Sequence, residues 1–368
     1  MDLYLISIIA FFAALAVIIY KDRKNIDFKY ILIMRRTKRF KSGIDRIARK
    51  SPLLWKIIGT FAIIVSLFYM IQGTYLIVVT QPTIQFVLPT PAARGTVGPG
   101  YILIPFWFWV IIVGTILVPH ELFHGIIARA EKIKLKSVGL LLLAIFPGAF
   151  VEPDEKQLKK AKILTKLRIF SVGSFANFVV SFIIFYLTLY VIWPSFVGPG
   201  ILLLNVTPSS PAEVGGLKSG MVLTEVNEKQ ITSTYIEYLN GTSYLSNEIG
   251  DAKPNQTIVI KSGENFYNVR LGFNSTTNST YMGIVYTPIF RIDEDFFMRV
   301  LIPLLTMISF FSLAVGIVNI LPIYPLDGGL IVQAIAERFA KKKSKYIVRA
   351  ITLFILFVLI YSFAKPFL

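Results

Sequence analysis

The chain contains two histidines, His120 and His124, which stand four positions apart with Glu121 between them. On an α-helix these positions share a face, so both imidazoles can bind one metal ion while Glu121 projects beside it. His-Glu-x-x-His on a helix is typical of zinc hydrolases. The pattern closes a long apolar run, where ionisable residues are costly and mark functional sites. Two core histidines with satisfied hydrogen bonds are the alternative, but they would not explain this apolar setting.

A catalytic zinc site needs a third protein ligand and leaves its fourth position to water. The chain has no cysteine, so this ligand must be a carboxylate. Glu152, Asp154 and Asp327 are the carboxylates within or at the end of apolar segments. Asp327 is favoured because Gly328-Gly329 follow it, and glycine lets the backbone approach a ligand closely. A helix-capping role for Asp327 is the alternative.

Glu121 faces about 100° away from its neighbours on a helix, so we expect it to act as general acid and base. In a membrane, such a site would hydrolyse a peptide bond within another protein's transmembrane segment. A transmembrane helix hydrogen-bonds its own carbonyl groups and must unwind before it is cut. Segments 138–153 and 319–329 could each offer backbone groups to an extended substrate, in the manner of strand addition.

Composition indicates a membrane protein with several spans. Hydrophobic residues make up 55% of the chain, charged residues make up 16%, and the mean hydropathy is +0.66. The net charge is +17, but 27 of the 38 Lys and Arg residues lie in segments 21–50, 131–168 and 338–349, each beside an apolar run. This is the positive-inside pattern of cytoplasmic loops. No nucleic-acid partner is therefore expected.

Six apolar runs are long enough to cross a bilayer. They are residues 2–20, 53–79, a run beginning at Tyr101, a run ending near Trp193, and residues 296–321 and 347–364. The first is expected to be a retained helix rather than a signal peptide, because its basic flank follows it. Span counting then places both termini outside and the ends of the third and fifth spans at the cytoplasmic face. Counted from Tyr101, His120 lies about 30 Å along its helix, near that face.

Two shorter segments are expected to lie outside the spans. Residues 80–100 are rich in proline and glycine and should form an external loop. The run 138–150 is too short to span a bilayer and should be re-entrant or interfacial, beside the histidines. The domain order is then two accessory helices with a basic cytoplasmic loop (1–100), core helices with the motif (101–193), an external domain (194–292) and a core helix with a final span (293–368).

The external domain has its own composition. Short alternating runs between residues 198 and 290 predict a small β-rich domain. Between residues 194 and 290 there are five basic and seven acidic residues, so the positive-inside signal is absent. The five Asn-x-Ser/Thr acceptors of the chain all lie here, at Asn205, Asn240, Asn255, Asn274 and Asn278. Glycosylation occurs outside the cytoplasm, which supports an external location.

The His-Glu-x-x-His, Gly173-x-x-x-Asn177 and Leu326-Asp327-Gly328 elements occur in that order, and with them the chain resembles the site-2 protease family of intramembrane zinc metalloproteases. The resemblance covers about residues 101–335. It implies that His120, His124 and Asp327 bind Zn²⁺ and that Glu121 is the catalytic acid and base. It also implies that Asn177 and Asn319 lie near the active site and contact substrate or the oxyanion. For Gly173, close helix packing is the alternative.

The resemblance further implies that residues 198–290 form a PDZ domain. Ser210-Pro211-Ala212-Glu213 and the segment 216–220 resemble the turn-helix part of such domains, although Met221 stands where an acidic residue is common. This domain could bind a peptide, or it could serve as a spacer or size filter, and the sequence favours neither role.

These features predict an α-helical multi-pass membrane protein of about six transmembrane helices with an inserted external β-rich PDZ-like domain. The expected activity is that of an intramembrane zinc endopeptidase that cuts membrane-anchored regulatory proteins. Expected partners are transmembrane protein substrates, the lipid bilayer and a peptide at the PDZ-like domain. The alternatives are a catalytically silent receptor or scaffold, which Glu121 disfavours, a transporter, or a metallopeptidase of another family with glutamate as third ligand. Acceptor sites without cysteines favour an archaeal cell surface.

Overall fold

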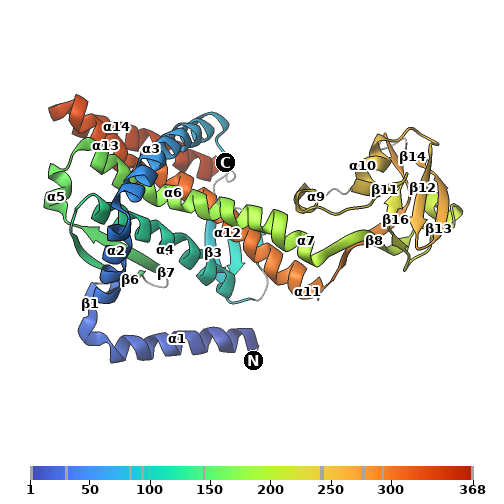
Figure 1. Ribbon diagram of the computed structural model, residues 1–368, viewed down its shortest axis with the longest axis horizontal. Helices are drawn as coiled ribbons and strands as arrows, with labels where there is room; N and C mark the ends of the chain where they lie inside the picture. Colours follow the sequence, from blue (N-terminus) through green and yellow to red (C-terminus); the bar gives the residue numbers. More distant parts are fainter. Residues whose placement is uncertain are drawn as a thin grey trace. The chain divides into compact units, whose positions relative to one another are not determined.

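The computed structural model describes residues 3–29, 32–82, 85–92, 95–98, 100–143, 146–240, 244–274, 278–291 and 294–365. The chain forms two compact units, Met1–Phe182 with Met307–Leu368, and Ile183–Thr306 (Figure 1). Within the described residues, six helices are long and apolar enough to cross a membrane: Leu3–Lys21, Pro52–Thr80, Phe106–Ala130, Ile163–Phe196, Phe297–Ile320 and Lys341–Ala364. This number agrees with the expected multi-pass membrane protein.

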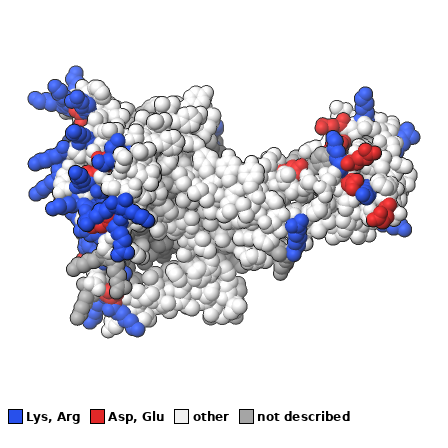
Figure 2. All heavy atoms as spheres, in the orientation of Figure 1, with Lys and Arg blue, Asp and Glu red and all other residues white. Residues whose placement is uncertain are grey.

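The first unit is mainly helical. Its helices are α1 (Leu3–Lys21), α2 (Lys38–Lys50), α3 (Pro52–Tyr75) with the π-helical turn η2 (Leu76–Thr80), α4 (Phe106–Ala130), α5 (Glu155–Lys160), α6 (Ile163–Leu187), α12 (Ile302–Ile320), α13 (Asp327–Phe339), the 3₁₀ turn η5 (Lys341–Lys343) and α14 (Ser344–Ala364). Pro322 and Pro325 separate α12 from α13, because proline lacks the amide hydrogen that would continue a helix. Figure 2 shows Lys and Arg side chains gathered at one end of this unit.

An antiparallel sheet lies beside α4 in the order β1-β2-β6-β7 (Figure 1). Its strands are β1 (Ile26–Lys29), β2 (Leu32–Arg36), β6 (Leu135–Leu143) and β7 (Phe146–Pro153). The run expected to be re-entrant or interfacial is therefore the β-hairpin β6–β7, and its entry into the membrane stays a prediction. The basic segment 21–50 also contributes to this sheet, because β2 pairs with β6 from Leu32↔Leu143 to Arg36↔Gly139.

The segment before α4 differs from the expected loop. Residues 80–100 contain β3 (Phe86–Thr90) and β4 (Thr96–Gly98), which flank β5 (Tyr101–Pro105) in one small sheet. The helix therefore begins at Phe106, and the expected start near Tyr101 is wrong.

His120 lies 14 residues after Phe106, about 21 Å along the axis, and ten more residues follow it to Ala130. The motif is thus near the middle of α4, and its position near the cytoplasmic face rests on the charge pattern alone.

The second unit contains a β-rich region, as expected. One sheet has the order β16-β8-β9 and comprises β8 (Val197–Val206), β9 (Val222–Leu223) and β16 (Ile284–Phe290). Another has the order β11-β10-β12-β13 and comprises β10 (Glu225–Val226), β11 (Lys229–Gln230), β12 (Thr257–Ser262) and β13 (Asn265–Arg270). Buried Ile201, Leu223, Ile258 and Ile260 form part of the core. Ile258 and Ile260 alternate with exposed neighbours along β12, as a half-buried strand requires.

Candidate zinc site

His120 and His124 project from one face of α4. Their ring nitrogens Nε2 lie 3.1 Å apart, as the four-residue spacing predicted. Pro119 stands inside the helix and has no amide hydrogen for the carbonyl of Thr115, so the helix loses one internal hydrogen bond directly before the motif. His120 is buried, whereas the ring of His124 is partly buried.

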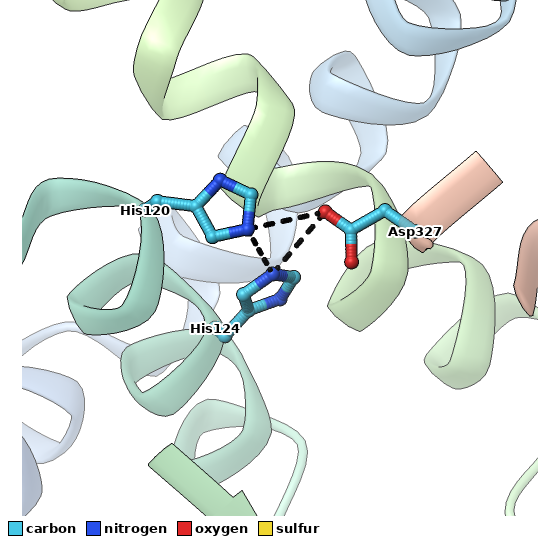
Figure 3. A group of neighbouring side chains, drawn as sticks. All are labelled: His120, His124 and Asp327. Carbon is cyan, nitrogen blue, oxygen red and sulfur yellow. Dashed lines mark hydrogen bonds and ion pairs between the residues drawn. The ribbon is translucent and has the colours of Figure 1, made fainter. Parts of the chain in front are cut away.

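Asp327 completes a cluster of three ligand atoms with the two histidines (Figure 3). Its Oδ2 lies 3.4 Å from His120 Nε2 and 3.3 Å from His124 Nε2. Tetrahedral zinc, with bonds near 2.0–2.1 Å, holds its ligand atoms about 3.3 Å apart, so the three distances match the edges of such a tetrahedron. Two imidazoles and one carboxylate also have the chemistry of a catalytic zinc site with one position left for water. The cluster therefore fits zinc.

Two glycines let Asp327 reach the histidines. Asp327 is the first residue of α13, and a Cβ atom added at Gly328 would overlap the carbonyl oxygens of Ile320 and Leu321. At Gly329 an added Cβ would overlap the backbone of the turn between the two helices. Only glycine therefore allows the end of α12 to fold back against the start of α13. The carboxylate of Asp327 points to the histidines, so the capping alternative is not what the structure shows (Figure 3).

Gly173 brings α6 (Ile163–Leu187) directly over the ligand atoms. A Cβ atom added at Gly173 would lie 2.7 Å from His120 Nε2 and closer still to His124 Nε2. Real Cβ atoms do not approach other heavy atoms so closely, so any side chain here would displace the imidazoles. Gly173 therefore allows α6 to pack closely against the imidazoles of His120 and His124.

Both histidines have a hydrogen-bond partner on α6 at the ring nitrogen that faces away from the cluster. His124 Nδ1 lies 2.6 Å from the carbonyl oxygen of Ile169, and only an N–H group can donate there. This leaves Nε2 of the neutral ring as an unprotonated ligand atom, the usual arrangement around metal-bound histidine. On His120, Nδ1 lies 3.2 Å from the side-chain amide of Asn177.

Asn177 is fully buried, and one end of its amide has no partner among the residues that the structure describes. Amide oxygen and nitrogen are interchangeable assignments, so the tautomer of His120 decides which end faces the ring. If Nε2 binds a metal, Nδ1 carries the proton, and the amide oxygen of Asn177 must accept the hydrogen bond that Nδ1–H donates. The amide nitrogen of Asn177 then occupies the buried end that no described residue satisfies.

Glu121 is not part of the ligand cluster. Its Oε2 accepts a hydrogen bond of 3.0 Å from the backbone N–H of Val151 on β7. The apolar segment expected to lie beside the motif therefore contacts it through this bond. One carboxylate oxygen remains for another partner, which a general acid and base requires.

The other candidate residues lie elsewhere. Glu152 accepts from Ser137 at 2.6 Å and pairs with Lys136, and Asp154 caps α5, so neither rival carboxylate belongs to the cluster. Asn319 is partly buried near the end of α12, and its amide makes no hydrogen bond with the residues that the structure describes. Its role near the substrate stays a prediction.

Sequence patterns did not indicate three contacts of the site. The hydroxyl of Ser174 lies 3.5 Å from Asp327 Oδ2, a long hydrogen bond from a fully buried side chain. Its position between Gly173 and Asn177 was the available signal. The carbonyl of Ile169 and the N–H of Val151 are backbone groups, and the type of a residue does not predict that its backbone contacts a site.

Comparison with known proteins places this geometry in a family. The chain aligns with an uncharacterized protein of Methanocaldococcus jannaschii at 26% identity over 339 residues, which cover 90% of this chain and 86% of the relative. It also aligns at 27% identity over 187 residues with a Thermotoga maritima protein provisionally named a zinc metalloprotease, covering 43% of this chain and 35% of that protein. The profile of Peptidase family M50 matches residues 108–362, which contain His120, His124 and Asp327. The chain therefore belongs to peptidase family M50, the site-2 protease family.

Proposed function

We propose that this chain is an intramembrane zinc endopeptidase of the site-2 type, which hydrolyses peptide bonds in the transmembrane segments of membrane-anchored regulatory proteins. The observation that carries the proposal is the cluster of His120, His124 and Asp327, whose ligand atoms have the spacing of a tetrahedral zinc site. The histidines lie on α4, a candidate membrane span, and this position supports a substrate that lies within the bilayer. Peptide bonds of transmembrane segments satisfy this condition.

The residues divide the chemistry among them. When bound by the cluster, zinc supplies Lewis acidity that polarises the scissile carbonyl and makes a water molecule more acidic. Glu121 takes a proton from the attacking water and passes it to the nitrogen of the leaving amine. The N–H of Val151 holds one oxygen of Glu121 and leaves the other for this transfer. Asn177 holds the ring of His120 through a contact of 3.2 Å with Nδ1.

A reporter experiment tests the proposal. The purified protein is reconstituted in vesicles with a fluorescently tagged single-span protein whose transmembrane segment contains an Asn-Pro helix break. We expect cleavage inside the span, located by mass spectrometry, that stops when a chelator removes the metal and returns with Zn²⁺. Cleavage only outside the span would contradict the intramembrane assignment. Zinc binding without any cleavage would favour the silent receptor or scaffold.

The free edge of β7 can hold the substrate in extended form. Among the strands that the structure describes, β7 pairs with β6 alone, so its other edge is the outer edge of the sheet, and the N–H of Val151 on that edge bonds Glu121. In an antiparallel pair, the backbone groups of alternate residues point to the same edge, so the N–H and C=O of Ala149 also point away from β6. An unwound substrate segment can add to these groups as a further strand beside Glu121.

Ala149→Pro should reduce reporter cleavage at least about ten-fold while zinc binding stays unchanged, because proline removes one outward N–H and is tolerated on edge strands. Gly148 is less suitable, since its N–H points toward β6, where it is in register with Leu141, and proline there would disrupt the hairpin. Ala149→Val, which keeps the N–H, is the matched control and should cleave normally. Equal cleavage by the proline and valine variants would exclude strand addition at this residue.

We also propose that the β-rich region is a PDZ-like domain on the external side of the membrane, open to a peptide ligand or serving as a size filter. Its turn-helix element is formed by α8 (Pro211–Val214), with Ser210 as its capping residue. All five acceptor asparagines have exposed side chains, and Asn255 and Asn278 have the positive φ of turn residues.

Translation into microsomes tests the orientation. If the β-rich region enters the lumen, the chain should gain several glycans that an endoglycosidase removes, and replacing the acceptor asparagines with glutamine should abolish them. A chain that stays unglycosylated would contradict the external location.

A further inference from the structure

The helix α2 (Lys38–Lys50) presents a basic surface beside a membrane span. Lys41, Arg46, Arg49 and Lys50 form no ion pair with any residue that the structure describes. Three of them line a groove of about 610 Å³ together with Ser42 and Asp45. We call these four residues the α2 cations.

Apolar side chains accompany the α2 cations. Phe40 is 54% exposed and Ile47 is 42% exposed, and both lie at the margin of the packed face of α2, on which Ile44 and Ala48 are buried. Only Ser51 separates α2 from Pro52, the first residue of the span α3. A helix at the end of a span with free cations and exposed apolar residues is suited to the boundary between lipid headgroups and acyl chains.

The packed face of α2 lies against the helix that carries the histidines. Buried Ile44 packs so closely over Gly125, the residue after His124, that a Cβ atom added there would lie 3.1 Å from Ile44 Cδ1. One turn further along α4, Arg129 forms an ion pair with Asp45. A shift of α2 would therefore be transmitted to α4 within one turn of His124.

Trp55 provides a second connection. Its indole N–H donates to the carbonyl of Ile47 at 3.1 Å, and its ring meets the ring of Phe123 edge-on with centroids 5.9 Å apart. Phe123 lies between Glu121 and His124 in the motif. The end of α2, the start of α3 and the motif are thus joined by direct contacts, the kind of physical network that can carry coupling.

We propose that α2 docks on the headgroups of anionic phospholipids through the α2 cations, and that this contact positions the His-Glu-x-x-His segment of α4, so that anionic lipid regulates cleavage. The lipid contact stands independently of the chemistry, whereas the regulation rests on the proposed function. The attraction is electrostatic, so it weakens as salt screens the headgroups.

The absence of cysteine from the chain allows a single probe to be placed on α2. A Phe40→Cys variant labelled with acrylodan is reconstituted in phosphatidylcholine vesicles with or without phosphatidylglycerol. We expect the emission to move to shorter wavelength as the phosphatidylglycerol content rises, because the probe enters a drier environment. Replacing the α2 cations together with glutamine should remove this response. The matched control replaces Lys341, Lys342, Lys343 and Lys345, four exposed cations that pack with α13 and α14, and should keep it.

Reporter cleavage provides the second readout. Phosphatidylglycerol should raise the cleavage rate at least about five-fold in the native protein and in the control variant, but not in the variant without the α2 cations. An emission that is indifferent to lipid charge, or a response that survives loss of the α2 cations, would overturn the lipid contact. A lipid-dependent emission with lipid-independent cleavage would overturn the regulation alone. If no condition gives cleavage, the proposed function fails while the emission still tests the lipid contact.

Discussion

Glu121→Gln should reduce peptide hydrolysis by about 10²- to 10⁴-fold while the protein keeps its metal and its fold. Glutamine has nearly the same size as glutamate and can still accept the hydrogen bond from Val151, so the contact between α4 and β7 should survive. It cannot take a proton from water at neutral pH, so the reaction loses its base. The cleavage rate of the single-span reporter, the zinc content and the thermal unfolding temperature together check this expectation.

The same variant should reveal natural substrates. In cells that carry Glu121→Gln in place of the native chain, membrane-anchored fragments should accumulate, and quantitative proteomics of the membrane fraction would detect them. Glu155→Gln is the control, because Glu155 is exposed at the start of α5 and lies outside the ligand cluster. If no membrane-anchored fragment accumulates, the protease proposal loses its main support. If the variant loses zinc, Glu121 has a structural role that its hydrogen bond to Val151 does not explain.

The ligand cluster could be inferred from sequence because each member has a distinctive residue type. His120 and His124 are the two histidines of the chain, and helical spacing alone predicts that they share a face. Asp327 was favoured over Glu152 and Asp154, because prolines break the helix before it and two glycines follow it. The structure adds distances of 3.3 and 3.4 Å from its Oδ2 to the two ring nitrogens.

The sheet beside the site could not be inferred in the same way. The run Val138–Leu143 is almost continuously apolar, so it lacks the alternation that identifies a half-buried strand. Its partner β2 lies about a hundred residues earlier, in a segment whose many charges suggested a cytoplasmic loop. Strand pairing of this kind depends on a distant segment, which local patterns do not contain. The late start of α4 has a related cause, because residues 101–105 are apolar enough to continue the span but pair as β5.

The backbone groups that contact the site could not be predicted from the sequence either. Every residue has a carbonyl and nearly every residue has an N–H, so nothing distinguishes Ile169 or Val151 before the helices and strands are assembled. Glycine gives a partial signal, because a residue without a side chain marks a position where a neighbour can approach the backbone closely. The sequence left two interpretations of Gly173, a part of the active-site motif or a residue for close helix packing. In the structure, Gly173 packs directly against both imidazoles, so the two interpretations describe the same contact.

Gly173→Ala should weaken zinc binding at least about 100-fold and thereby abolish cleavage. The added methyl group would lie 2.7 Å from His120 Nε2 and even closer to His124 Nε2, so the rings must move. Metal sites tolerate changes of only about 0.2 Å in ligand distance, and losing a supporting partner alone costs 10- to 100-fold in affinity. Competition with a chromogenic chelator measures the affinity directly.

Gly114→Ala is the matched control, since Gly114 lies on α4 itself and an added Cβ there meets no atom within 4 Å. Alanine favours a helix over glycine by up to about 1 kcal/mol, so this variant should bind zinc normally and unfold at an equal or higher temperature. The two variants add the same methyl group to glycines of neighbouring helices, and only one methyl points at the imidazoles. Metal-free Gly173→Ala should therefore unfold near the temperature of the metal-free native protein, with its loss confined to the stabilisation that zinc adds. Zinc binding of native strength in Gly173→Ala would mean that α6 does not cover the ligand atoms, and the ligand cluster would need another explanation for its spacing.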